Sequence, residues 1–163
     1  MTEVATTTTE TMERAWKELE RHKVWMLTTR GGEGFHARPM HAVPSRAEHC
    51  IWFVADRGGV KDEEIARENH VGLTTCDGNF YMAVAGTAEV VEDRTKMQEI
   101  WSTPMQAYFP EGPLDPRACL LRVTPTRAEL WDSSNSLVGV FKMVAAIVQK
   151  ERADLGDHQK TRL

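Results

Sequence analysis

The chain has 163 residues, of which 41% are hydrophobic and 27% charged, a composition typical of one soluble globular domain. Its net charge of −4 disfavours nucleic-acid binding, which usually relies on a surplus of lysine and arginine. No apolar run is long enough to span a membrane, and the polar, acidic N-terminus lacks the pattern of a signal peptide, so we expect a cytoplasmic protein.

The first predicted element is a helix over residues 10–22. Met12, Trp16 and Leu19 fall on one face of this helix at helical spacing. Residues 1–9, which include four consecutive threonines, are expected to be disordered.

A hairpin follows the helix. VWMLTTR at 24–30 and GFHARPMHAVP at 34–44 have the composition of strands, and GGEG between them is typical of a hairpin turn. Arg38 and Pro39 are unusual in the second strand. Proline cannot donate to a β-ladder, and an arginine among apolar neighbours needs a partner or a function.

The next segment is strongly apolar. CIWFVAD at 50–56 is apolar on both faces and predicts a strand that is buried on both sides. RGGVKDEEIAREN at 57–69 predicts a glycine turn that enters a short helix, with Lys61 at the N-terminus of that helix.

Two more strands are predicted at residues 70–76 and 79–92, joined by a turn at Asp77-Gly78. Gly86 lies inside the second strand and predicts a bulge or a sharp bend.

The pattern then changes to a helix at 93–101, which Asp93 could cap. Residues 102–118 contain four prolines, a tyrosine and a phenylalanine, so we expect a compact loop held by aromatic side chains. Residues 119–133 predict a further hairpin with Pro125 in its turn.

The last predicted helix, 136–150, is amphipathic, and the charged tail at 151–163 is expected to fray. We expect one domain over residues 10–150, because no linker or internal repeat divides the chain. The fold class is therefore mainly β, with about six hairpin-connected antiparallel strands that curl into a barrel with peripheral helices.

Cysteine and histidine spacing gives no metal signature. Cys50, Cys76 and Cys119 form no Cys-x-x-Cys pair, so we expect buried free thiols and no zinc site. His36 and His41 would point to opposite faces of one strand, which disfavours a shared metal.

Two local features could carry chemistry. Arg38 shares a strand face with Met40 and Ala42, so it either lies at a solvated edge, pairs with an acidic side chain, or faces a bound anion or an electron-rich ring. Lys61 either lies in a solvated turn or binds a phosphate together with the free N–H groups of the helix N-terminus.

In combination and in order, several segments resemble one known family. They are VWMLTTR, HARPM, IWFVADRGGVKDEEI, YMAVAGTAEVVED and LLRVTPTRAELWDS. Together they resemble the pyridoxamine 5′-phosphate oxidase-like superfamily, whose members form FMN-binding split barrels, and within it the general stress protein 26-like branch. The resemblance extends from about Trp16 to about residue 158.

The resemblance implies a six-stranded antiparallel split barrel that works as a homodimer, with FMN, or alternatively FAD, at the dimer interface. By position it implies residues that contact the isoalloxazine ring and residues that contact the phosphate. Of these, either Tyr81 or Trp131 can come from the second subunit. The implied cofactor-binding residues are Arg38, Pro39, Met40, Val54, Ala55, Gly59, Lys61, Tyr81 and Trp131.

The chain departs from the family pattern at two places. Gly59 replaces a serine that relatives use as a phosphate donor, and the backbone N–H groups nearby could substitute for its hydroxyl. The C-terminus also lacks the Arg-Leu-His segment of the vitamin B6 oxidases, so pyridoxamine phosphate is not expected to be the substrate.

Three functions remain open. The first is an FMN-dependent oxidoreductase acting on an unknown small molecule. The second is a flavin store or redox sensor without turnover, and the third is a split barrel that binds another small ligand.

Overall fold

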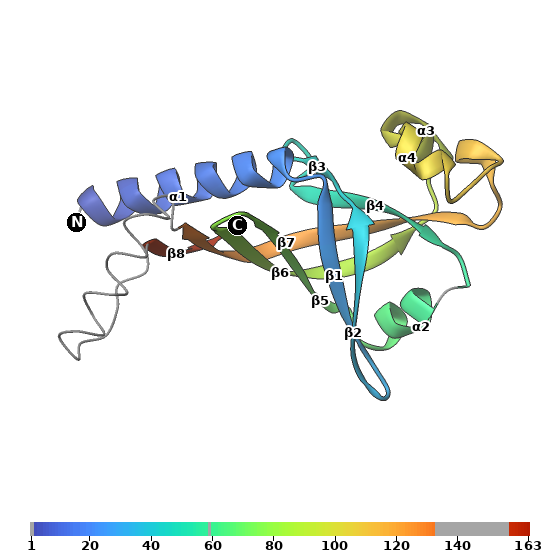
Figure 1. Cartoon of the computed structure of the whole chain (residues 1–163), viewed down its shortest axis with the longest axis horizontal. Helices are drawn as coiled ribbons and strands as arrows, with labels where there is room; N and C mark the ends of the chain where they lie inside the picture. The colour runs from blue at the N-terminus through green and yellow to red at the C-terminus, as the bar shows by residue number, and fades with distance from the viewer. Residues whose placement is uncertain (1, 59, 133–156) are drawn as a thin grey trace.

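The computed structural model describes residues 2–58, 60–132 and 157–163. Its helices and strands are α1 (Thr2–Arg21), β1 (Val24–Gly31), β2 (Gly34–His41), β3 (Val43–Ser45), β4 (Cys50–Asp56), α2 (Val60–Arg67), β5 (His70–Asp77), β6 (Phe80–Val91), α3 (Arg94–Ile100), α4 (Thr103–Gln106), the 3₁₀ helix η1 (Gly112–Leu114), β7 (Ala118–Asp132) and β8 (Asp157–Arg162). Figure 1 shows a curled sheet with α1 along one side, α3 and α4 at one end, and α2 near the β1–β2 hairpin.

The strands form an antiparallel sheet in the order β2-β1-β5-β6-β7-β4-β3, and β8 pairs with β7. Because β2 and β3 are separated by Ala42 alone, the chain passes directly from one edge of the sheet to the other. Counting β2 and β3 as one bent strand gives six strands that close on themselves, apart from β8. The predicted mainly-β split barrel is therefore confirmed.

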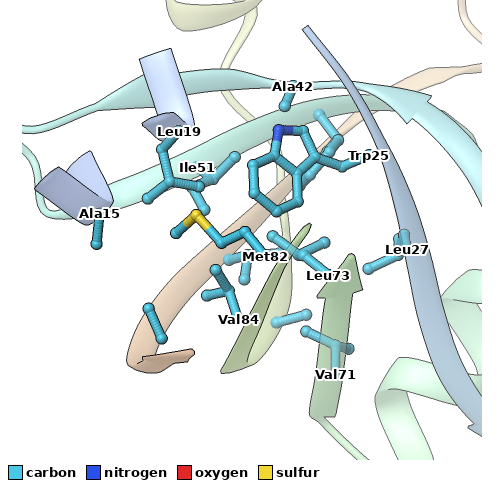
Figure 2. Close-up of a cluster of buried hydrophobic side chains, with 14 of the residues drawn as sticks. Ala15, Leu19, Trp25, Leu27, Ala42, Ile51, Val71, Leu73, Met82 and Val84 are labelled. Carbon is cyan, nitrogen blue, oxygen red and sulfur yellow. The ribbon is translucent and has the colours of Figure 1, made fainter. Parts of the chain in front are cut away.

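Packing in the core explains why buried and exposed side chains alternate along some strands and not along others. The strand β1 exposes every second side chain, so Trp25 and Leu27 face the barrel interior (Figure 2). The strand β4 is buried on both faces, as predicted, because Ile51 and Phe53 join the main core while Trp52 packs in a second cluster beneath α3.

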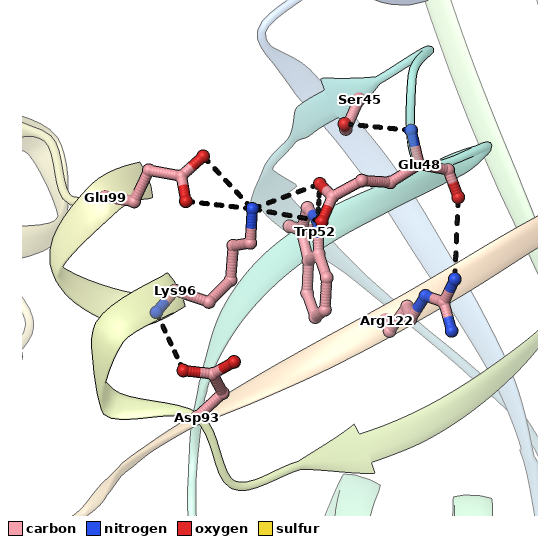
Figure 3. A network of polar contacts seen from close by, with 7 residues as sticks. All are labelled: Ser45, Glu48, Trp52, Asp93, Lys96, Glu99 and Arg122. Atoms are coloured by element: carbon pink, nitrogen blue, oxygen red, sulfur yellow. Dashed lines mark hydrogen bonds and ion pairs between the residues drawn. The ribbon is translucent and has the colours of Figure 1, made fainter.

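A polar network fastens α3 to the barrel (Figure 3). Lys96 on α3 contacts Glu48 and Glu99, and the indole of Trp52 donates to Glu48 over 3.0 Å. The predicted cap of this helix is also present, since Asp93 accepts from the backbone N–H of Lys96.

The structure corrects the predictions for both termini. The helix α1 begins at Thr2, so residues 2–9 continue the helix that was expected to start at residue 10. Extending a helix that is already packed costs less than nucleating one, even though threonine is a weak helix former. The tail expected to fray contains β8, which pairs with β7 over residues 157–162. The predicted helix at 136–150 lies outside the described residues.

The predicted hairpin at 119–133 is wrong, because β7 runs unbroken through Pro125. The register between β6 and β7 shifts at this point, where Gly86 pairs with Pro125 and Arg127 pairs with Ala85. A bulge accepts a proline because one backbone donor there is unpaired in any case. Gly86 thus forms part of the bulge that was predicted, and Pro125 belongs to the same bulge.

The cysteines are all free, as predicted, but only two of the three are buried. Cys76 is exposed, since it lies on the outward face of β5.

Candidate functional site

The strands β2 and β4 separate and leave a cleft between them. Pairing between β3 and β4 ends at Val43, which lies opposite Trp52. If this register continued, Met40 and Pro39 would face Ala55 and Asp56. Instead β2 pairs with β1, and a pocket of about 530 Å³ opens between these residues.

Five of the nine predicted site residues line this one pocket: Arg38, Pro39, Met40, Val54 and Ala55. Arg38, Pro39 and Met40 come from β2, whereas Val54 and Ala55 come from β4. Since β2 is an edge strand, Pro39 occupies a position where proline is tolerated.

The remaining wall was not predicted. It consists of Val24, His41, Asp56 and four residues of the segment after α3, namely Pro104, Met105, Tyr108 and Phe109. The sequence signal for this wall was present in the proline-rich, aromatic segment 102–118, which was predicted only as a compact loop.

Contacts among its own residues stabilise the segment after α3. Trp101 and Phe109 pack with ring centroids 6.2 Å apart, and Gln106 accepts from the Trp101 indole and donates to the Pro110 carbonyl. Phe109 is buried, as the compact loop requires, whereas Tyr108 is 78% exposed at the pocket wall. A fixed segment thus presents an exposed aromatic ring beside an apolar pocket.

Arg38 has an acidic partner on α2. Its guanidinium donates to Glu64 over 3.2 Å and to the Thr29 hydroxyl over 3.4 Å. Burial alone would raise the pKa of Glu64, but hydrogen bonds from Thr29 and Arg38 hold that pKa below its usual value. Of the alternatives considered for Arg38, the structure shows a pairing with an acidic side chain, and the same arginine also lines the pocket.

His41 adds a proton-exchanging group to the pocket wall. Burial lowers its pKa, and the positive charge of Lys23 lowers it further. The imidazole is therefore neutral at pH 7 and can donate or accept a hydrogen bond.

The residues predicted to bind the phosphate of the flavin, Gly59 and Lys61, follow β4 in the chain. Gly58 has a φ of +95°, a conformation that favours glycine, and α2 begins at Val60. Lys61 is the second residue of α2, and its side chain lies outside the described part of the structure, as does Gly59.

Tyr81 and Trp131 do not line the pocket in this chain. They pair with each other across β6 and β7, and they are 50% and 36% exposed. Cys76 on β5 pairs with Tyr81 from the other side, so the three residues form an exposed row across the outward face of the sheet.

The described ranges contain neither a metal-binding cluster nor a membrane-spanning helix. No group of three or more histidine, cysteine or acidic side chains there could hold a metal ion. No helix among those residues has both the length and the apolar character needed to cross a membrane.

A family profile described as pyridoxamine 5′-phosphate oxidase like matches residues 10–154. No curated protein sequence matches the chain significantly.

Solved structures with the same fold cover most of the chain. A candidate general stress protein 26 from Jannaschia sp. CCS1 is 24% identical, with a TM-score of 0.72 over 96% of this chain and 99% of its own. The general stress FMN/FAD binding protein from Xanthomonas citri is 25% identical, with a TM-score of 0.69 over 79% and 93%. The General Stress Protein 26 from Bacillus anthracis str. Sterne is 18% identical, with a TM-score of 0.65 over 73% and 92%.

Proposed function

Because the chain belongs to the pyridoxamine 5′-phosphate oxidase-like family, we propose that it binds a flavin in the cleft between β2 and β4. The observation that carries this proposal is that five residues implied by the family pattern line one pocket, although they come from two strands. A solved relative of 25% identity is itself described as FMN/FAD binding.

The residues present fit a flavin. Pro39, Met40, Val54 and Ala55 offer apolar surface for a flat ring, and Arg38 supplies a positive charge at the same wall. The pocket volume of about 530 Å³ is within the usual range of small-ligand sites.

FMN is our preferred flavin, and FAD is the alternative. The helix α2 starts shortly after Asp56, the last residue of β4 and part of the pocket lining. A phosphate bound at this helix start would be attracted by its backbone N–H groups and by the charge of Lys61.

We further propose that the protein is an oxidoreductase that acts on a small molecule other than pyridoxamine phosphate. A bound flavin would supply two-electron redox chemistry. Arg38 would stabilise negative charge on the ring, and neutral His41 could exchange a proton at the pocket wall. The alternative is a flavin store or redox sensor, which the mostly apolar lining of the pocket would equally suit.

A homodimer would complete this site. The outward face of the sheet exposes Val24, Met26, Tyr81 and Trp131, an unusual set of large apolar side chains for a free surface. Val24 also lines the pocket, so the face and the pocket adjoin. In a homodimer across this face, Tyr81 and Trp131 would be available to the partner's flavin.

The test of flavin binding is the visible absorption of the purified protein and its titration with FMN and riboflavin. We expect bound FMN, with riboflavin weaker by at least about ten-fold because it lacks the phosphate hydrogen bonds. A colourless protein that takes up neither flavin would contradict the proposal and favour another small ligand. Flavin-dependent oxidation of NADH or NADPH would support turnover over storage.

A further inference from the structure

Glu64 is a buried acid that contacts Arg38, one of the residues lining the proposed flavin site. Its side chain is 4% exposed, and its carboxylate meets Thr29, Arg38 and His36, with His36 Nδ1 lying 2.8 Å from Oε1. Burying a carboxylate is costly unless other groups compensate for it. The three polar partners supply this compensation, which indicates that Glu64 has a specific role in this cluster.

The position of Glu64 follows from a change in the barrel interior. On the face of the β1–β2 hairpin that includes Trp25, the paired residues change along the strands. Trp25 pairs with Met40, Leu27 pairs with Arg38, and Thr29 pairs with His36, whose side chain is partly exposed but contacts Glu64. The apolar core thus gives way to polar groups at the end of the barrel that α2 covers, and Glu64 is the acid that α2 brings there.

The backbone at the end of β1 leaves room for this carboxylate. A Cβ atom on Gly31 would lie 3.0 Å from Oε1 of Glu64, which is closer than ordinary packing allows. The absence of a side chain at Gly31 therefore lets the carboxylate come close to the end of β1, where it meets Thr29 and Arg38.

Arg38 is the one group of this cluster that also lines the pocket. Its side chain is 23% exposed, and its contacts to Glu64 and Thr29 leave other guanidinium N–H groups for a ligand. An arginine has many rotamers in water, so holding it in advance reduces the entropy lost on binding.

We propose that Glu64 is a positioning residue that fixes Arg38 against the isoalloxazine ring. This inference rests on the proposed flavin function, which it deepens.

The test uses riboflavin, which reads the ring end alone, and the variants Glu64→Gln, Arg38→Ala and their double mutant. Glu64→Gln keeps the side-chain shape and removes the charge. We expect it to weaken riboflavin binding by about ten-fold, the value of one charge-assisted hydrogen bond. In the Arg38→Ala background the same change should have no further effect, because Glu64 acts through Arg38.

Glu68→Gln is the matched control. Glu68 lies just after α2, is more exposed, and contacts His70 instead of Arg38, so its replacement should leave riboflavin affinity unchanged. If Glu64→Gln binds riboflavin as the wild type does, or if the two losses multiply in the double mutant, the inference is overturned.

Two further measurements cover the cases in which a variant does not fold or the wild type binds no flavin. If Glu64→Gln does not fold, Thr29→Val takes its place in the test. This variant removes the hydroxyl that contacts both Glu64 and Arg38, and it should also weaken riboflavin binding. If the wild type binds no flavin, the proposed function fails. In that case urea unfolding of the flavin-free variants tests whether Glu64 and Arg38 are energetically coupled. A double mutant that loses less free energy of unfolding than the sum of the two single mutants supports the coupling, and additive losses contradict it.

Discussion

At the scale of residues, Arg38 and Pro39 have separate explanations. Pro39 is tolerated because β2 is an edge strand, and it lines the cleft where β2 leaves β4. Arg38 is tolerated because the barrel interior becomes polar at that level, where Glu64 and Thr29 accept its hydrogen bonds. The pairing with Glu64 could not be predicted from the sequence, since Glu64 lies 26 residues away on α2.

Lys61 gives a prediction at this scale. Lys61→Glu should weaken FMN binding by at least about ten-fold, because it replaces an attractive charge near the phosphate with a repulsive one. Riboflavin binding should change little. Titrations of both flavins measure the two effects, and Arg67→Glu at the other end of α2 is the control. Equal binding of FMN and riboflavin by the wild type would remove the phosphate role of Lys61.

At the scale of elements, the sequence predicted best where the pattern was local. The predicted strands 24–30, 50–56 and 70–76 match β1, β4 and β5 closely. The mistake at Pro125 arose because proline has two meanings in a β-region, a turn or a bulge. The deciding partner is Gly86 on a strand more than thirty residues earlier, so the choice depends on pairing that no local pattern contains.

The bulge gives a test at Gly86. A Cβ atom there would lie 2.5 Å from the Thr124 carbonyl oxygen, so the two backbones would have to separate. Gly86→Ala should therefore lower the free energy of unfolding by about 1–3 kcal/mol, as overpacking does elsewhere. Urea denaturation measures this, with Gly32→Ala as the control because a Cβ atom there meets nothing within 4 Å. Equal stability of both variants would show that β6 and β7 are not so close at the bulge.

The attachment of α3 gives a pH prediction. Hydrogen bonds from Trp52, Ser45 and Lys96 lower the pKa of Glu48 from 4.5 to about 2. Because the pKa is lower in the folded state, this stabilisation is complete above about pH 4.5 and is lost as the pH falls towards 2. Thermal unfolding from pH 5 to pH 2 should therefore depend on pH less in Glu48→Gln than in the wild type. Glu10→Gln on α1 should behave as the wild type does, and identical profiles for all three proteins would contradict the role of Glu48.

At the scale of the whole molecule, the closed sheet was predictable from the number of antiparallel strands, but the pocket was predictable only in part. Its two strand walls belong to segments with recognisable patterns. The third wall comes from Pro104, Met105, Tyr108 and Phe109, whose place depends on how the segment after α3 folds back over β4. That packing is a tertiary contact without a periodic signal.

The exposed row on the sheet gives a prediction about assembly. We expect sedimentation to show a dimer of the 18.4 kDa chain, because Tyr81 and Trp131 leave apolar surface uncovered. Tyr81→Glu should shift the population to monomer and weaken flavin binding by placing a charge in that interface. Leu114→Glu changes an apolar residue on η1 that is even more exposed, at 64% against 50% for Tyr81, and should leave the dimer intact. A monomeric wild type would contradict the interface.

The most direct test of the account is the electron density of FMN in crystals of the full chain grown at a saturating FMN concentration. We predict that the ring lies between β2 and β4, against Pro39, Met40, Val54 and Ala55, with Arg38 at its edge and the phosphate at the start of α2. Density for FMN on another surface, or a cleft without FMN in crystals of protein that is saturated in solution, would contradict the account.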